Sequence, residues 1–192
     1  MTAARVLSTH VPAPPPGADG RSPVAVRPAG AAGLAVALAL HPQAWAPLVE
    51  YREESRWTHL LDPERAAAAL DPSQHAELAG AQVWLLSWLP GQGTPLHDHG
   101  RSAGAFAVAR GTLTERVVTR RGTQGPHQST TDLTTGRVRW FGRPYVHQVV
   151  NSLPTPAVSI HVYTPTLRLM NTYRIEPTGL VRTGTERAGV DW

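Results

Sequence analysis

Two histidines separated by one residue, in the segment Thr94-Pro-Leu-His-Asp-His-Gly100, have the spacing of a metal site. His97 and His99 are two positions apart, so on an extended backbone both side chains leave the same face. Imidazole nitrogen is a good ligand for first-row transition metals, and such a pair supplies two adjacent coordination positions. A third ligand must come from elsewhere, and His147 is the candidate. The alternative interpretation of the pair is two polar surface residues beside a turn.

A serine, a histidine and a tyrosine alternate with apolar residues in the strand candidate 157–164. On an extended chain Ser159, His161 and Tyr163 share one face, and the apolar residues between them share the other. In a barrel strand the polar face would point into a site. A buried tyrosine needs a partner for its hydroxyl group, and a serine–histidine–tyrosine chain would fix its direction. The alternative is a structural hydrogen-bonded cluster, just as His147 could be a satisfied core histidine.

The composition limits the class of protein. A chain of 192 residues suits one domain with some terminal excess, and can bury most of its apolar surface without disulfides. The absence of cysteine excludes disulfides, thiolate metal ligands and cysteine nucleophiles. All 18 basic residues are arginines, yet the net charge is only +4, and no basic run with interleaved aromatic residues supports nucleic-acid binding. No apolar segment reaches about 18 residues, so we expect no membrane span and a cytoplasmic protein.

Four segments follow from the distribution of breakers and from the hydrophobic period. Residues 1–29, rich in proline and glycine, are expected to form a flexible N-terminal arm. Residues 30–80 are expected to form a helical lead-in, and residues 81–176 a β-barrel. Residues 177–192 are expected to be a loosely held C-terminal tail.

The lead-in contains three helix candidates. The alanine- and leucine-rich residues 30–40 predict a helix that ends at His41, because the residue before a proline is pushed out of the helical region. A second helix is expected from residue 42 to about residue 51, and a third over residues 62–79. Asp62 is the expected N-cap of the third helix.

From residue 81 the period becomes that of strands. Residues 81–89 are apolar on both faces, which is typical of a strand buried on both sides. Short strand candidates with glycine turns between them then follow, and such a series indicates a closed or double-sheet β fold. The candidates are 94–99, 103–110, 112–120, 126–132, 136–141, 144–150, 157–164 and 171–176.

The segment from Gly91 to Gly111 resembles the first motif of the cupin superfamily, which has a glycine, five residues, His-x-His and a later glycine. Pro144, His147 and Asn151 resemble the second motif. Cupins are small jelly-roll barrels. The resemblance therefore implies a mainly β fold, a cupin jelly-roll barrel with the N-terminal helices packed against it.

One departure narrows this resemblance. In many cupins a glutamate ligand follows the His-x-His pair, and that position is Gly104 here. Three histidines without the glutamate are typical of the thiol dioxygenases, of which cysteine dioxygenase is the best-known member. The segment 151–165, which carries the serine, histidine and tyrosine, closely resembles the same family. The chain thus resembles actinobacterial members of the cysteine dioxygenase type I family over residues 30–176.

A second departure concerns the tyrosine of this family. Animal cysteine dioxygenases join a cysteine to the active-site tyrosine. The position corresponding to that cysteine is again Gly104, and the chain has no cysteine. Tyr163 is therefore expected to act unmodified.

The resemblance implies an Fe(II) centre held by His97, His99 and His147. Three neutral imidazoles leave a divalent ion its full positive charge and three open positions, and iron(II) accepts a mixed nitrogen and sulfur ligand set and activates O2. We expect a small thiol, L-cysteine, to bind through its thiolate and its amine, with O2 in the third position. Transfer of both oxygen atoms to sulfur would give cysteine sulfinic acid.

The resemblance also implies roles for side chains around the metal. Ser159, His161 and Tyr163 are the expected catalytic group, with Tyr163 orienting the bound oxygen or the substrate carboxylate. The family binds this carboxylate with an arginine upstream of the first motif. That position falls nearer His59 here, and Arg56 could replace it by a shift of register, so both are predicted substrate-binding residues with Tyr163. The expected partners are the thiol and O2, in a monomer or weak homo-oligomer.

Three alternatives stay open. The substrate could be a thiol without the amine, such as 3-mercaptopropionate. The chain could be another metal cupin enzyme, such as an isomerase or a quercetinase-like dioxygenase, although those enzymes usually keep the glutamate that Gly104 replaces. It could also be a non-enzymatic cupin that binds a small molecule, although residues 30–79 contain no clear DNA-recognition helix.

Overall fold

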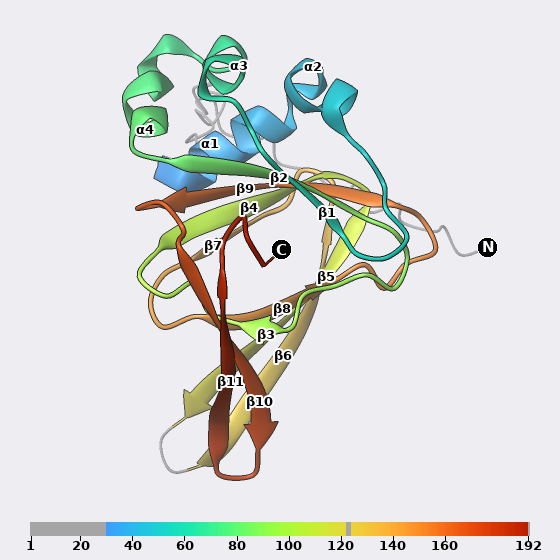
Figure 1. The fold of residues 1–192 in the computed structure, drawn as a ribbon, viewed down its shortest axis with the longest axis vertical. Helices are drawn as coiled ribbons and strands as arrows, with labels where there is room; N and C mark the ends of the chain where they lie inside the picture. Colours follow the sequence, from blue (N-terminus) through green and yellow to red (C-terminus); the bar gives the residue numbers. More distant parts are fainter. Residues whose placement is uncertain (1–29, 122–123, 192) are drawn as a thin grey trace, which may run out of the picture.

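Two antiparallel β-sheets face each other and form a barrel, with short helices at one end (Figure 1). The computed structural model describes residues 30–121 and 124–191. The expected N-terminal arm, residues 1–29, lies outside the described residues. The mainly β, jelly-roll architecture with N-terminal helices packed against it, expected from the sequence, is confirmed.

The first sheet has the strand with the serine–histidine–tyrosine alternation at its centre. Its strands pair in the order β1-β2-β9-β4-β7, all antiparallel. Their bounds are β1 Trp57–Leu60, β2 Gln82–Trp88, β4 Ala103–Arg110, β7 Val138–Phe141 and β9 Ala157–Thr164. The central strands β2, β9 and β4 are almost fully buried, which is why β2 is apolar on both faces.

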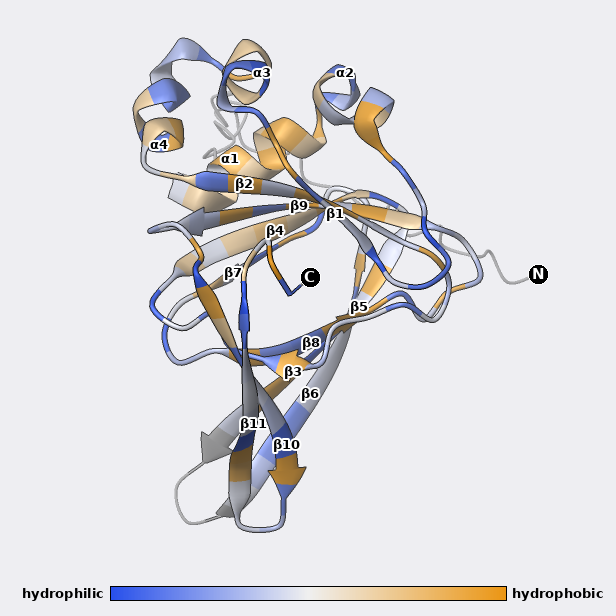
Figure 2. Ribbon diagram, in the orientation of Figure 1, coloured by the Kyte–Doolittle hydropathy of each residue, from blue (hydrophilic) through white to orange (hydrophobic). Residues whose placement is uncertain are grey.

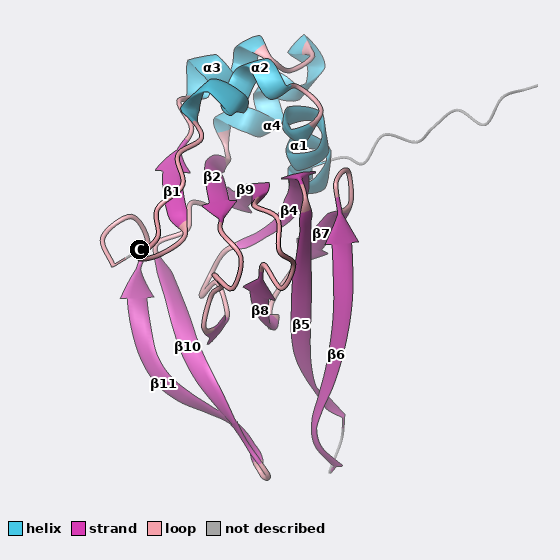
Figure 3. Ribbon diagram, turned by 90° about the vertical axis from the view of Figure 1, so that its right-hand side faces the viewer, coloured by secondary structure: helices cyan, strands magenta, loops and turns pink. Residues whose placement is uncertain are grey.

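The second sheet carries His97 and His147 of the candidate metal site, and His99 follows two residues after the end of β3. Its strands pair in the order β11-β10-β3-β8-β5-β6. Their bounds are β3 Leu96–His97, β5 Thr112–Arg121, β6 Gln124–Thr134, β8 Val146–Val150, β10 Leu169–Glu176 and β11 Gly179–Arg187. The hairpins β5–β6 and β10–β11 extend away from the helices (Figure 3).

The helices cover the outer face of the first sheet (Figures 1 and 3). Their bounds are α1 Gly30–Ala39, α2 Pro42–Trp45, α3 Pro63–Ala68 and α4 His75–Ala79, with 3-10 turns at Ala46–Leu48 and Pro72–Gln74. The expected break before Pro42 is present. The expected N-cap of the third helix is confirmed, because the Asp62 carboxylate accepts a hydrogen bond from the Arg65 backbone N–H at 2.9 Å.

Two helix predictions were wrong in their extent. The second helix stops at Leu48 instead of continuing to residue 51. The third is divided, because Pro72 forces Asp71 into an extended conformation (φ −64°, ψ 139°). The Asp71 carboxylate then accepts a hydrogen bond from the Ser73 N–H at 2.9 Å and starts a new turn.

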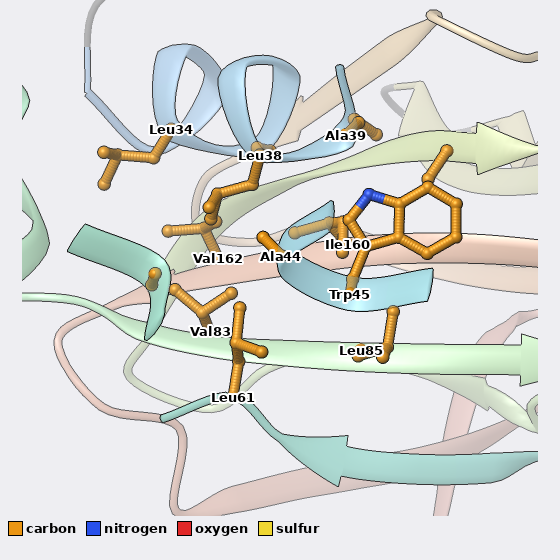
Figure 4. Packing of buried hydrophobic residues seen from close by; sticks show 14 of the residues in the cluster. Leu34, Leu38, Ala39, Ala44, Trp45, Leu61, Val83, Leu85, Ile160 and Val162 are labelled. Carbon is orange, nitrogen blue, oxygen red and sulfur yellow. The ribbon is translucent and has the colours of Figure 1, made fainter. Parts of the chain in front are cut away.

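Hydrophobic side chains pack on both sides of the first sheet. On the outer side Leu34, Leu38 and Trp45 of the helices pack over Ile160 and Val162 of β9 (Figure 4), and α1 is largely hydrophobic (Figure 2). An inner core between the sheets is built from the residues Trp84, Leu86, Trp88, Phe106, Val108, Leu113, Leu133, Phe141, Val149, Ala157, Tyr163, Leu167 and Met170. The alternation of β9 therefore places its apolar residues against the helices and its polar residues inside the barrel.

Two strands were not expected from the sequence. β1 is only four residues long, and β11 lies in the segment that was expected to be loosely held. That expectation was wrong, since β11 pairs with β10 along its length. The residues of β11 are mostly half-buried or exposed. Such a strand needs no apolar face, so its sequence lacks the alternation of apolar and polar residues that predicts a strand. Among the described residues, no helix has the length and apolarity to cross a membrane.

Candidate metal centre

Three histidines converge inside the barrel because of the pairing of β3 with β8. His97 and His147 are directly opposite each other in this antiparallel pair, so their side chains are cross-strand neighbours. His99 follows two residues after His97, and all three side chains are buried. Their ring centroids lie 4.7–5.0 Å apart, and one nitrogen of each lies within 4.8 Å of the others. The structure thus brings together the three predicted ligands.

The free nitrogens of this cluster suit a cation. Among the described residues, the His147 Nε2 and His99 Nδ1 atoms have no hydrogen-bond partner although both are buried, which is unusual for polar atoms. The His97 Nδ1 atom is 2.9 Å from the Pro95 carbonyl, to which it donates, so its Nε2 atom keeps a free lone pair. Burial, and then the neighbouring imidazoles, lower the pKa of His97 and of His99 well below its ordinary value. Neutral imidazole is the form that binds a metal.

Asp98, between the two histidines, fixes their segment to β10. One of its carboxylate oxygens accepts hydrogen bonds from the Gly100 N–H at 2.8 Å and from the Asn171 side-chain amide at 2.9 Å. The other accepts from the Tyr173 hydroxyl at 2.6 Å. Gly100 has a positive φ of 57°, which turns the chain away directly after His99.

Gly104 has no room for a side chain, which gives a physical reason for the missing glutamate. A Cβ atom at this position would lie 2.1 Å from the Val162 carbonyl oxygen and 3.1 Å from the Phe141 ring. Phe141 occupies this space and stacks on His99, with ring centroids 4.1 Å apart and an interplanar angle of 21°. Within the described residues, the histidine cluster contains no carboxylate.

A chain of hydrogen bonds runs from the core to the site through the alternating face of β9. The Trp88 Nε1–H donates to Ser159 Oγ at 2.9 Å, and Ser159 Oγ lies 2.9 Å from His161 Nε2. Because indole nitrogen is only a donor, the serine hydrogen is left for His161 Nε2, and the histidine proton then lies on Nδ1, 3.4 Å from the Tyr163 oxygen. We assign this direction, which leaves the Tyr163 hydroxyl hydrogen for the cavity.

Burial keeps this chain neutral. It lowers the pKa of His161 to about 3, and electrostatic interactions with His147 and Arg56 act in the same direction. It raises the pKa of the Tyr163 phenol above its ordinary value, and Arg56 opposes this only in part. The tyrosine is therefore a hydrogen-bond donor at neutral pH.

A narrow cavity adjoins the histidine cluster, with a volume of about 10 Å³, which is room for about one water molecule or ion. Besides the three histidines it is lined by Arg56, Leu86, Thr94, Val149, His161, Tyr163 and Met170. The histidine cluster, the hydrogen-bonded tyrosine and Arg56 thus line one small space.

The two predicted carboxylate-binding residues lie on opposite sides of β1. Arg56 lines the cavity, and its guanidinium carbon is 5.9 Å from the centroid of the Trp88 ring. His59 stacks on Trp57 with ring centroids 5.3 Å apart, and Trp57 belongs to the outer core under the helices. Residues of odd and even number leave a strand on opposite faces, so the described structure brings Arg56 to the site and keeps His59 away. Burial lowers the pKa of Arg56 from its ordinary value, and an anion in the cavity would offset that desolvation.

Sequence reasoning missed a buried acid beside the cluster. The Glu115 side chain is completely buried and accepts a hydrogen bond from His147 Nδ1 at 2.7 Å. Arg139 and Tyr145 also donate to it, at 2.5 Å and 3.1 Å. Burial by itself would raise the pKa of Glu115, but His147 and Arg139 outweigh it and the pKa is lowered. The available signal was an acid on the same face of β5 as the buried Leu113.

The sequence model of the family described as cysteine dioxygenase type I matches residues 51–175. No curated protein matches the chain. This match includes the three histidines, the β9 alternation, Arg56 and Glu115.

Solved structures with a similar arrangement share little sequence. TT1209 from Thermus thermophilus is 19% identical, with 62% of this chain and 92% of that chain covered and a TM-score of 0.47. An uncharacterized protein with a double-stranded β-helix domain from Klebsiella pneumoniae is 17% identical, with 72% and 93% covered and a TM-score of 0.45. A recombinant oxalate oxidase in complex with glycolate is 17% identical and has a TM-score of 0.47. The match covers 60% of this chain and 54% of that one, about half its length. At such identities the likeness says nothing about the reaction.

Proposed function

Because the chain belongs to the cysteine dioxygenase type I family, we propose that it is an Fe(II)-dependent thiol dioxygenase that oxidises L-cysteine with O2 to cysteine sulfinic acid. The observation that carries this proposal is the cluster of three buried histidines without a carboxylate among the described residues. The reaction is balanced as one thiol and one O2 giving one sulfinic acid, with both oxygen atoms on sulfur.

The three histidines are the residues that would hold the ion. They supply neutral nitrogen donors and no compensating negative charge, so an anionic thiolate is favoured as the next ligand. When bound, iron(II) supplies the redox chemistry that combines O2 with the sulfur of the thiol. The cavity is narrow, so it limits the entry of bulk water, and its lining side chains would have to move to admit the thiol and O2.

Arg56 is the proposed partner of the substrate carboxylate. Arg56 lines the cavity that the histidines also line, whereas His59 stacks on Trp57 of the outer core. Arginine binds carboxylates through two parallel hydrogen bonds, and such a pair strengthens where water is excluded. A thiol that carries a carboxylate would therefore be preferred to one that does not.

Tyr163 is the proposed orienting group. The chain from Trp88 through Ser159 and His161 holds the phenol oxygen as an acceptor, so its own hydrogen is directed to a group in the cavity. Because burial keeps the phenol protonated, it can donate to a substrate carboxylate or to oxygen. The absence of cysteine leaves this tyrosine without a crosslink.

The test is oxygen uptake by anaerobically purified protein loaded with Fe(II), with the sulfinate product measured by mass spectrometry. We expect stoichiometric oxygen uptake and sulfinate product with L-cysteine, and weaker turnover with cysteamine, which lacks the carboxylate. The same assay with 3-mercaptopropionate, which lacks the amine, tests the alternative substrate. Faster turnover of 3-mercaptopropionate would change the substrate within the same activity. No uptake with any of these thiols would reject the dioxygenase and leave another metal cupin enzyme or a binding protein.

Variants separate the two candidate carboxylate-binding residues. Arg56→Ala should raise KM for L-cysteine by about 10-fold or more, since a charge-assisted pair contributes about 1.5–3 kcal/mol, and should change KM for cysteamine little. His59→Ala should leave both values near wild type. Arg52→Ala is the control, because Arg52 is exposed and pairs with Glu50. If His59→Ala instead produces the selective loss, the assignment of Arg56 is wrong.

A further inference from the structure

A completely buried carboxylate lies behind one of the proposed metal ligands. The Glu115 side chain has 0% exposure and three donors surround it: His147 Nδ1 at 2.7 Å, Arg139 Nε at 2.5 Å and the Tyr145 hydroxyl at 3.1 Å. A buried charge is stable only where donors satisfy it. The arrangement is therefore complete, with every contact directed at the two carboxylate oxygens.

Strand register places Glu115 against His147. β5 pairs with β8 so that Val117 is opposite His147 and Glu115 is opposite Val149. Glu115 is then the diagonal neighbour of His147 on the same face, within reach of a long side chain. Arg139 comes from β7 of the other sheet, and its side chain is 33% exposed, so it connects the buried carboxylate to the solvent side.

The donors determine which nitrogen of His147 carries the proton. The guanidinium group of Arg139 only donates, and an ionised carboxylate only accepts. His147 must therefore donate its Nδ1–H to Glu115, which places the lone pair on Nε2. That Nε2 atom is buried and has no hydrogen-bond partner within the described part of the chain, and His147 is one of the three clustered histidines.

The three histidines are held in different ways. His97 donates to the backbone carbonyl of Pro95, while His99 stacks on Phe141 and its Nδ1 atom is buried without a partner. Within the described residues, His147 alone of the three is bonded to a charged side chain. A carboxylate on the far nitrogen makes an imidazole a stronger ligand and fixes its ring.

We propose that Glu115 is a positioning residue of the metal centre, which fixes the tautomer and orientation of His147, with Arg139 and Tyr145 holding its carboxylate in place. The proposal rests on the proposed metal site but not on the identity of the thiol. Glu115 does not touch the space where the metal or the substrate would lie, so its effect passes through His147.

Glu115→Gln is the direct test. The amide has the same shape but replaces one acceptor oxygen by a donor, so one of His147 and Arg139 faces an N–H group instead of an oxygen. We expect the Kd for Co(II), titrated into the metal-free full-length protein with a competing chelator, to rise about 10- to 100-fold. The second measurement is ¹⁵N NMR of the metal-free protein, where the variant should show a mixed or reversed His147 tautomer.

Asp132→Asn is the matched control. Asp132 is an exposed carboxylate on β6 of the same sheet and accepts a hydrogen bond from Thr114 at 2.7 Å. This variant removes one negative charge and should keep the wild-type Kd and the wild-type tautomer. Equal weakening of Co(II) binding in both variants would mean that net charge, and not positioning, sets the affinity, and would overturn the proposal.

The possible outcomes separate the two proposals. A Glu115→Gln protein that melts at a lower temperature but keeps the Co(II) Kd and the tautomer would reduce Glu115 to a structural role. If that variant does not fold, Arg139→Gln and Tyr145→Phe decide, because each should weaken Co(II) binding several-fold, and unchanged affinity in both overturns the proposal. If the wild-type protein fails the dioxygenase assay but Glu115→Gln still weakens Co(II) binding as expected, the proposed function is rejected and the positioning role of Glu115 stands.

Discussion

The substitution Ser159→Ala removes one buried hydroxyl group and should destabilise the protein far more than the loss of a single oxygen atom suggests. Ser159 is completely buried, and its hydroxyl group bonds two side-chain nitrogens: it accepts from Trp88 Nε1 and donates to His161 Nε2, both at 2.9 Å. The alanine leaves both nitrogens buried and unsatisfied. Each such group costs about 1–3 kcal/mol, so we expect a loss of roughly 2–6 kcal/mol, a large fraction of the total stability of a domain.

Urea denaturation of the metal-free protein, followed by circular dichroism, measures this loss. Ser102→Ala is the control, because Ser102 is also buried but its hydroxyl donates only to the carbonyl of the exposed Thr166 at 3.2 Å. Ser102→Ala should lower the free energy of unfolding by about 1 kcal/mol. Trp88→Phe in the Ser159→Ala background removes one of the two unsatisfied groups, so the two losses should be less than additive by about 1–3 kcal/mol.

Two results would refute the reasoning about this series of hydrogen bonds. One is a Ser159→Ala variant no less stable than Ser102→Ala, which would mean that water satisfies the two nitrogens that lose their partner. The other is strict additivity with Trp88→Phe, which would mean that the indole and the serine do not depend on each other. Either result would also remove the basis for the direction assigned to the Tyr163 hydroxyl.

Three further predictions concern the site and its surroundings. His97→Ala should abolish retention of stoichiometric iron, measured by metal analysis after Fe(II) loading and desalting, and full retention would remove His97 from the ligand set. Gly104→Ala should lower the free energy of unfolding by about 3 kcal/mol or more, because the new Cβ would lie 2.1 Å from the Val162 carbonyl oxygen. In the same urea assay Gly142→Ala, whose Cβ would lie 3.7 Å from its nearest neighbour, should change this free energy by no more than about 1 kcal/mol. The free energy of unfolding of the metal-free protein should fall as the pH decreases below about 6.5. His161 of the unfolded state then binds a proton, whereas native His161, with a pKa of about 3, does not. A free energy of unfolding that is the same at pH 7 and pH 5 would contradict this.

The pair of histidines in the candidate metal site and the alternating face of β9 could be predicted from the sequence because both depend on local spacing. Residues two apart share a face of any strand, so His97 with His99, and Ser159 with His161 and Tyr163, needed no knowledge of the partner strands. Their burial was implied by the apolar residues around them.

Interactions across strands could not be predicted, because they depend on register. A shift of one residue exchanges the two faces of a strand, which is why Arg56 and His59 could not be separated before β1 was placed. Glu115 reaches His147 only through the pairing of β5 with β8. Trp88 lies on β2, both faces of which are buried, so its sequence did not tell which face looks into the barrel.

The proposed ligands and the proposed orienting tyrosine belong to different sheets. His97 and His147 lie on β3 and β8 of one sheet, and Tyr163 lies on β9 of the other. Facing sheets are held about 10 Å apart by side-chain packing alone, here by the inner core that includes Phe106 and Phe141. The distance between the Tyr163 phenol and the histidine cluster therefore depends on the packing of that layer, and the ring centroids of His99 and Tyr163 are 5.3 Å apart. Replacement of Phe106 or Phe141 by a smaller side chain would change this distance, and the proposed turnover should then fall even if each sheet keeps its own strand pairing.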